Sequence, residues 1–261
     1  MRSATINIMI RAAEKAARKL KRDFGEIEQL QVSRKGPADF VSNADLASER
    51  TLREELLHAR PNYGFMAEES EKEIVGDGAH RFIVDPLDGT TNFLHGIPHF
   101  AISIALEREG ELVAGVIYDP IKDEIFWAER GAGAFMNDRR LRVAGRSELS
   151  EAVVATGTPF LGRGVTDHYM PILTRIMPQV AGIRRFGAAS LDLAYVASGR
   201  YDGFFEYDLN AWDVAAGIII IKEAGGFVSA LGSKNPPLTA GEILAANDRL
   251  HGKLLKVILN K

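Results

Sequence analysis

The sequence predicts a mixed α/β fold, an α+β half at residues 1–147 followed by an α/β half at residues 148–261. In the first half, two helical patterns precede a group of closely spaced apolar segments with short turns between them. After about Val143 strand and helix patterns alternate, which is typical of α/β units. Because no repeat, low-complexity tract or long linker separates the halves, we expect one compact unit.

Two helices are expected before the first strand. From about Ser3 to Phe24, apolar residues recur at helical spacing with charged residues between them. A second helix is expected to begin near Ser42, to carry the apolar residues Leu46, Leu52, Leu56 and Leu57, and to end before Pro61. The polar segment between the two helices, Ser33 to Val41, is expected to be a loop.

Four strands complete the first half. They are expected at Phe82–Val84, Phe100–Glu107, Leu112–Tyr118 and Glu124–Ala128. The pairs Glu109-Gly110 and Asp119-Pro120 supply turns between them. This pattern predicts an antiparallel meander with helices on one side.

The second half alternates three short strands with four helices. Strands are expected at Val153–Thr156, Phe204–Glu206 and Ile243–Ala245, and helices at Tyr169–Met177, Ala188–Ser198, Ala211–Ala224 and about Asp248–Ile258.

The composition excludes several classes of protein. The chain has 32 basic and 35 acidic residues, a formal net charge of −3, which does not favour binding to nucleic acid by bulk electrostatics. It has no cysteine, so disulfides, thiolate metal sites and a cysteine nucleophile are excluded, and a cytoplasmic location fits. The N-terminus lacks a signal-peptide apolar core, and no apolar run approaches the ~20 residues of a membrane span, so we expect a soluble protein.

The segment Asp85-Pro86-Leu87-Asp88-Gly89-Thr90-Thr91-Asn92 carries the strongest chemical signal. A buried strand leads directly into two carboxylates three residues apart. Carboxylates and backbone carbonyls are the ligands of hard divalent cations, and Pro86 could leave the carbonyl of Leu87 free. Gly89 lets the main chain approach a phosphate, which the following amides could hold. A lone turn of this kind is more often solvated; the apolar strand before it and the further acids favour a metal site.

Three other acidic positions have a functional and a structural interpretation. Glu68 and Glu69 follow Phe65-Met66-Ala67, and one of them could complete a metal site with Asp85, although alone the segment is more typical of a solvated loop. Asp213 lies in the first turn of an apolar helix, where it could bind a metal or only favour the helix dipole. Asp45 stands three residues after Ser42, the spacing of a capping box.

Other catalytic arrangements are missing from the sequence. There is no G-x-S-x-G elbow, no G-x-x-x-x-G-K-[ST] loop and no H-E-x-x-H spacing. His95, His99 and His168 are expected at the surface or in packing. Carboxylates beside a phosphate-binding turn favour metal-activated water over a protein nucleophile.

At this point the motifs resemble those of the inositol monophosphatase family. They are Lys35-Gly36-Pro37-Ala38-Asp39-Phe40-Val41-Ser42-Asn43-Ala44-Asp45, Ala67-Glu68-Glu69-Ser70, Asp85-Pro86-Leu87-Asp88-Gly89-Thr90-Thr91-Asn92-Phe93, Trp212-Asp213-Val214-Ala215-Ala216-Gly217 and Glu223-Ala224-Gly225-Gly226. The resemblance covers essentially the whole chain. It implies a layered αβαβα sugar-phosphatase fold, usually a homodimer, and hydrolysis of an inositol monophosphate or another small phosphorylated polyol.

The same resemblance implies up to three Mg²⁺ ions per active site and inhibition by lithium. The first ion would be held by Glu68, Asp85 and the carbonyl of Leu87, and the second by Asp85, Asp88 and Asp213. The third would lie beside Glu68 with mostly water ligands.

It also implies roles for the surrounding residues. Glu68 and Thr90 would orient the attacking water, with Asp45 hydrogen-bonded to Thr90; we prefer this role to the capping box. The amides of Gly89 and Thr90 would hold phosphate. The substrate hydroxyls would be surrounded by Asp88, Ala189, Glu206 and Asp213, and Lys35 lies on the loop that would close over the site. Ala188 stands where relatives often carry threonine, which puts one substrate contact in doubt.

Two alternatives stay open. Related metal sites serve histidinol phosphate, fructose bisphosphate and 3′-phosphonucleotides, and histidinol phosphate is the strongest rival substrate. Some bacterial relatives also associate with the transcription machinery, so Arg184 and Arg185 could contact RNA polymerase or a transcription factor. A pair of arginines is more often a solvated surface.

Overall fold

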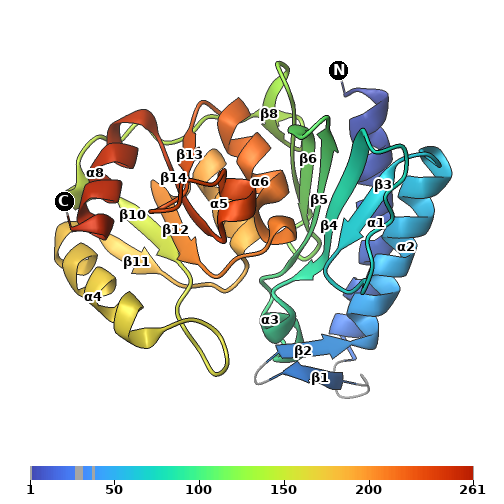
Figure 1. Ribbon diagram of the computed structural model, residues 1–261, viewed down its shortest axis with the longest axis horizontal. Helices are drawn as coiled ribbons and strands as arrows, with labels where there is room; N and C mark the ends of the chain where they lie inside the picture. The colour runs from blue at the N-terminus through green and yellow to red at the C-terminus, as the bar shows by residue number, and fades with distance from the viewer. Residues whose placement is uncertain (1, 27–31, 37–38, 261) are drawn as a thin grey trace.

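The fold of the chain has five layers, visible side by side in Figure 1. The computed structural model describes all residues except 1, 27–31, 37–38 and 261, and it describes no side chains between 27 and 42. Helices and sheets alternate in the order helix pair, seven-stranded sheet, helix pair, five-stranded sheet, helix pair. The predicted α/β class and its αβαβα layering are confirmed.

The first two layers are the outer helix pair and the larger sheet. The helices are α1 (Ala4–Phe24) and α2 (Asn43–Ala59). The strands, in spatial order, are β3 (Gly64–Ala67), β4 (His80–Asp88), β5 (Ala101–Arg108), β6 (Glu111–Asp119), β7 (Glu124–Glu129), β8 (Gly133–Met136) and β9 (Arg139–Arg140). Only β3 and β4 are parallel; the other neighbours are antiparallel. Buried apolar side chains of α1, such as Met9 and Leu20, pack with those of the sheet, which accounts for the helical spacing in the sequence.

The central helices are α5 (Ala189–Ala197) and α6 (Ala211–Glu223). Both are buried along most of their length, so their sequences are apolar all round instead of amphipathic. Their side chains share one hydrophobic cluster with both sheets: Ile117 lies on the larger sheet, Leu191 and Ile219 on the helices, and Phe204 on the smaller sheet. The predicted boundary near residue 147 lies in an irregular segment and stays a prediction.

The last two layers are the smaller sheet and its outer helices. In spatial order the strands are β11 (Gly182–Arg184), β10 (Val153–Thr156), β12 (Gly203–Tyr207), β14 (Glu242–Ala246) and β13 (Phe227–Ser229). The outer helices are α4 (Thr166–Ile176) and α8 (Asp248–Leu259). The described residues also include short elements: α3 (Thr90–Leu94), α7 (Pro237–Ala240), and 3₁₀ turns at Leu149–Glu151 and Met177–Gln179.

Three expectations about local structure are wrong. The segment predicted as a loop, Ser33 to Val41, overlaps the antiparallel strands β1 (Val32–Gly36) and β2 (Asp39–Ser42). Leu46 does not lie on the buried face of α2, because its side chain is 50% exposed. The larger sheet has helices on both faces, where the prediction has them on one side. The short strands β3, β8, β9, β11 and β13 are not among the predicted strands, because two to four residues carry too little pattern.

No helix in the described part of the chain has the length and apolar character needed to cross a membrane.

Gly252 offers a test of helix propensity in α8. It lies inside this helix, it is exposed, and a Cβ added there would meet no atom within 4 Å. Gly252→Ala is therefore expected to raise the free energy of unfolding by about 0.5–1 kcal/mol, because alanine loses less backbone entropy in a helix. Urea unfolding of the two proteins measures the difference; an unchanged or lower midpoint would contradict this account of α8.

Candidate active site

The first two carboxylates come from a bulge near the end of β4. Asp85 pairs with Ser103 of β5 and Asp88 with Ala101, so the ladder shifts register between the two aspartates. Inside the bulge the backbone N–H of Leu87 donates to Oδ1 of Asp85 at 3.0 Å. Asp85 is 1% exposed and Asp88 8%. The bulge therefore interrupts regular pairing where both carboxylates are buried.

Asp88 is tied to the second half of the chain. Its Oδ2 accepts hydrogen bonds from the backbone N–H and the hydroxyl of Ser190, at 2.7 and 2.5 Å. Ser190 lies in the first turn of α5 and is fully buried, and Ala189 before it is 7% exposed. The predicted substrate-side residue Ala189 thus lies next to the group that holds Asp88.

Gly89 links β4 to α3. Its φ of 94° lies in the left-handed region, and a Cβ added there would come within 3.1 Å of the carbonyl oxygen of His99. Both observations explain a glycine at this position. In α3 the side-chain amide of Asn92 donates to the carbonyls of His99 and Phe186, each at 2.8 Å, which fixes the turn against the segment before α5.

Thr90 and Asp45 are brought together across the sheet edge. The hydroxyl of Thr90 lies 3.0 Å from Oδ1 of Asp45 and 3.1 Å from the carbonyl oxygen of Leu87. Asp45 is in the first turn of α2 and is fully buried. Because the side chain of Ser42 lies outside the described part of the chain, the capping-box interpretation with Ser42 stays untested.

Glu68 lies just beyond β3, which is parallel to β4. Its backbone N–H donates to the carbonyl of Val84 at 3.3 Å, one residue before Asp85. The residues that follow are held by Glu49 of α2, whose carboxylate accepts from the N–H of Glu69 at 2.9 Å and from the hydroxyl of Ser70 at 2.5 Å. This brings Glu68 to the same end of β4 as the two aspartates.

Asp213 enters from α6. Its Oδ2 accepts from the backbone N–H of Asn210 at 2.7 Å, which completes a capping box with that residue. Nη2 of Arg163 lies 3.8 Å from the same oxygen. Asp213 therefore begins its helix and also faces the other acids, so the two interpretations drawn from its sequence position are compatible.

Glu206, at the end of β12, is half-buried. A Cβ added at Gly157 would collide with its carboxylate, so this side chain lies directly against the backbone of residue 157. Burial raises the pKa of Glu206 to about 8. The nearby guanidinium groups of Arg163 and Arg185 oppose that rise.

The aspartates form one electrostatic cluster. Burial raises the pKa of Asp85 well above its usual range, and the charges of Glu68, Asp88 and Asp213 raise it further. Burial raises the pKa of Asp88 to about 7, against the effect of its hydrogen bonds from Ser190. The pKa of Asp213 is also raised, mainly by burial. Negative charges gathered without cations repel one another.

This donor set fits a hard divalent cation. All donors are carboxylate or carbonyl oxygens, the ligands that Mg²⁺ prefers, and a bound cation would relieve the repulsion felt by Asp85. Among the described residues, no group of three or more His, Asp or Glu side chains lies close enough together to hold a metal ion in this conformation. The hydrogen bonds that Ser190 donates to Asp88 and that Asn210 donates to Asp213 end on Oδ2 of each carboxylate. An ionised carboxylate has about four acceptor sites, so these bonds leave capacity for a cation.

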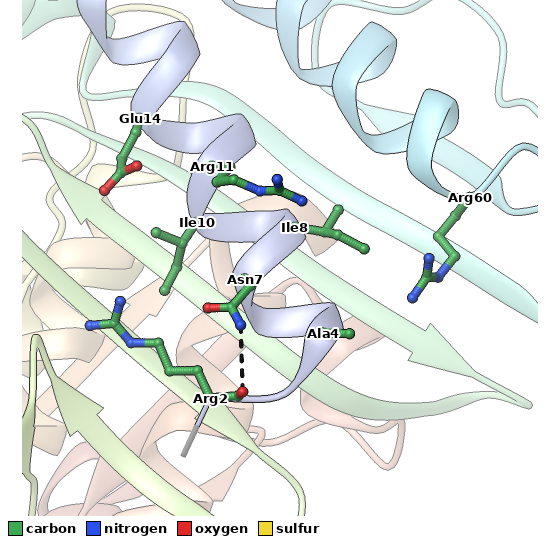
Figure 2. Close-up of a pocket in the computed structure, with 8 residues that line it drawn as sticks. All are labelled: Arg2, Ala4, Asn7, Ile8, Ile10, Arg11, Glu14 and Arg60. Carbon is green, nitrogen blue, oxygen red and sulfur yellow. Dashed lines mark hydrogen bonds between the residues drawn. The ribbon is translucent and has the colours of Figure 1, made fainter.

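One predicted residue stays untested, and one surface hollow lies elsewhere on the molecule. The side chain of Lys35 lies outside the described part of the chain, so its predicted place over the site is untested. A surface hollow of about 580 Å³ lies along the first turns of α1 (Figure 2). It is lined by Arg2, Arg11 and Arg60 among others and contains none of the predicted site residues.

Sequence reasoning missed Ser190, Glu49 and Arg163. Ser190 and Arg163 contact site residues that are distant in sequence, Asp88 and Asp213. Glu49 accepts a hydrogen bond from the backbone of Glu69, the residue next to Glu68. A serine in a first helical turn normally suggests local capping. No local pattern indicates such long-range contacts.

The comparisons with known proteins cover the whole chain. Residues 1–261 match the Inositol monophosphatase family. The chain is similar to the inositol-1-monophosphatase of Rhizobium meliloti, at 60% identity over 98% of this chain and 97% of the relative. It is 44% identical to the Nus factor SuhB of Pseudomonas aeruginosa, over 97% of this chain and 95% of that protein. The crystal structure of the extragenic suppressor protein suhB from Bartonella henselae superimposes with a TM-score of 0.95, at 56% identity and 98% coverage of both chains.

Proposed function

Because the chain belongs to the inositol monophosphatase family, we propose that its carboxylate cluster hydrolyses inositol-1-phosphate to inositol and phosphate with the help of Mg²⁺. The observation that carries the proposal is the meeting of four acids from distant segments: the charges of Glu68, Asp88 and Asp213 all act on Asp85. Buried carboxylates that repel one another destabilise a core, whereas in a cation site the bound ion offsets their repulsion.

The proposed metal ligands follow the family pattern. Glu68, Asp85 and the carbonyl of Leu87 would hold one Mg²⁺ ion, and Asp85, Asp88 and Asp213 a second. A third, weaker ion would lie by Glu68. When bound, the ions would neutralise the phosphate, lower the pKa of a water molecule and stabilise the leaving oxygen.

Thr90 and Asp45 have the arrangement needed to orient water. A threonine hydroxyl has one hydrogen, and here its acceptors are Asp45 and the carbonyl of Leu87. The oxygen of Thr90 then has lone pairs left to accept a hydrogen bond from the attacking water. Glu68, at the same end of β4, is the second proposed acceptor.

The phosphate and the polyol of the substrate would contact different residues. We assign the phosphate to the backbone N–H groups of Gly89 and Thr90, where the left-handed φ of Gly89 begins α3. We assign the hydroxyls to Asp88, Asp213, Glu206 and the backbone of Ala189. The loop that carries Lys35 would close over the substrate.

Gly157→Ala tests the substrate side. The added Cβ would displace the carboxylate of Glu206, the end of a flexible side chain, so we expect little loss of stability. Loss of one hydrogen bond to a substrate hydroxyl should raise KM for inositol-1-phosphate roughly tenfold, because such a bond contributes about 1–2 kcal/mol to binding. Steady-state kinetics and thermal unfolding measure both effects. An unchanged KM would remove Glu206 from the substrate site.

A panel of phosphate esters tests the substrate. Phosphate release from inositol-1-phosphate, histidinol phosphate, glycerol-2-phosphate and fructose-1,6-bisphosphate is measured at one Mg²⁺ concentration. We expect the highest kcat/KM for inositol-1-phosphate. A higher value for histidinol phosphate would replace the proposed substrate and keep the proposed chemistry. Lithium is expected to inhibit the reaction by replacing the weakly held ion.

A contact with the transcription machinery is a second candidate function. The similarity to a protein named Nus factor SuhB favours it. Arg184 and Arg185, both exposed, are the proposed contact residues. Pull-down of RNA polymerase by an Asp88→Asn variant tests this function apart from catalysis; failure of both this variant and the unaltered protein to retain the polymerase would dismiss it.

We also propose a homodimer and a cytoplasmic location. The first follows from the family, and sedimentation of the purified protein would measure it. The second rests on the absence of cysteine from the sequence.

A further inference from the structure

Arg163 is held in place near the acids by three contacts. Its backbone pairs with Phe160 in both directions, N to O at 2.9 and 3.0 Å, which makes a tight turn. Its guanidinium lies 5.8 Å from the centre of the Phe160 ring, and Nη2 donates to the carbonyl of Asp208 at 2.6 Å. These contacts limit how far the guanidinium can move from the site.

The same guanidinium is the counter-ion of Asp213. Nη2 lies 3.8 Å from Oδ2 of Asp213, whose side chain is 12% exposed, while that of Arg163 is 39% exposed. Among Asp85, Asp88 and Asp213, only Asp213 has an ion pair in the described part of the chain. A positive group of the protein therefore lies where the proposed function places a metal ligand.

We propose that Arg163 is a positioning residue that neutralises Asp213 in the metal-free protein and competes with the divalent cation for this carboxylate. The inference rests on the proposed function, which makes Asp213 a metal ligand. Because linkage is reciprocal, a guanidinium that is repelled by a bound cation must also lower the affinity for that cation. Arg163 would thus keep the second ion exchangeable and hold Asp213 in position until it arrives.

The test compares two arginines beside the same ring. The guanidinium of Arg185 lies 6.0 Å from the centre of the Phe160 ring and donates to Thr158, but it has no ion pair with Asp213 in the described residues. Arg163→Gln and Arg185→Gln both remove a charge beside Phe160, and only the first removes the contact with Asp213. Arg185→Gln is therefore the matched control.

Calorimetric titration of Mg²⁺ into chelator-treated protein gives the first measurement. Arg163→Gln is expected to bind the cation roughly threefold to tenfold more tightly than the unaltered protein, the size expected for a partly exposed charge pair. Arg185→Gln should change the affinity less than twofold. In an Asp213→Asn background, Arg163→Gln should have no further effect.

Thermal unfolding gives a second measurement that does not depend on cation uptake. In a chelator, Arg163→Gln should unfold roughly 1–3 °C lower than the unaltered protein, because Asp213 has lost its counter-ion. In saturating Mg²⁺ this difference should vanish. If Arg163→Gln does not fold, Arg163→Met replaces it. This variant also lacks the charge, so the same changes in cation affinity and unfolding temperature are expected.

The outcomes separate this inference from the proposed function. Unchanged or weaker cation binding by Arg163→Gln, with normal binding by the unaltered protein, would overturn the role of Arg163 and leave the proposed function intact. If the unaltered protein takes up no cation, the metal-dependent function itself fails, and the inference fails with it.

Discussion

Asp88→Asn is expected to lower kcat for inositol-1-phosphate roughly 100-fold or more at saturating Mg²⁺, the usual effect of losing a preorganised charge at a reacting centre. The substitution keeps the shape of the side chain but removes the charge that the site needs to hold a cation. Its stability should not fall much, since Oδ1 of the amide can still accept from Ser190, as Oδ2 of Asp88 does now. Phosphate release and urea unfolding measure the two quantities.

Glu68→Gln should lose activity to a similar extent, because the same cluster contains both acids. Asp138→Asn is the matched control: Asp138 has a side chain that is 96% exposed and pairs with Arg2, away from the acidic cluster. It should retain the full kcat. Near-normal turnover by both Asp88→Asn and Glu68→Gln would rule out the assigned roles.

Gly115→Val is expected to lower the free energy of unfolding by about 2–3 kcal/mol, through overpacking. Gly115 lies on β6, where α6 packs against the larger sheet. A Cβ added there would be 2.5 Å from Cγ2 of Ile219 and 2.8 Å from the carbonyl oxygen of Ala216. The carbonyl oxygen of Ala216 belongs to the backbone of α6, so relieving this overlap shifts α6 away from the sheet, and α6 carries Asp213. Activity should therefore fall together with stability, as urea unfolding and phosphate release would show.

Gly145→Val is the control for this effect. Gly145 is exposed, and a Cβ added there would meet no atom within 4 Å. Its unfolding midpoint should stay close to that of the unaltered protein. Equal stability of the Gly115 and Gly145 variants would mean that α6 does not pack as tightly against β6 as these distances indicate.

The elements that could be predicted are those with long patterns. The first 24 residues repeat apolar side chains at helical spacing because one face of α1 packs on the sheet, and α1 begins at Ala4. The segment 153–156 was predicted as a strand and is β10. The hairpin of β1 and β2 was missed, because backbone pairing between polar segments leaves no alternation of apolar residues.

The candidate site could be predicted as a set of acids but not as an arrangement. The order of Glu68, Asp85, Asp88 and Asp213 along the chain carries the family resemblance, and the structure brings their charges together. The groups that hold this arrangement belong to other elements: Ser190 of α5 donates to Asp88, and Glu49 of α2 holds the residues that follow Glu68. Such contacts depend on how helices pack against a sheet, which no local spacing reveals.

Phosphate release from inositol-1-phosphate during a titration of Mg²⁺ into chelator-treated protein tests the central claim most directly. If the buried acids form a cation site that hydrolysis requires, turnover starts near zero and rises to saturation with added Mg²⁺. Turnover that is already complete in the chelator and unaffected by Mg²⁺ would contradict it.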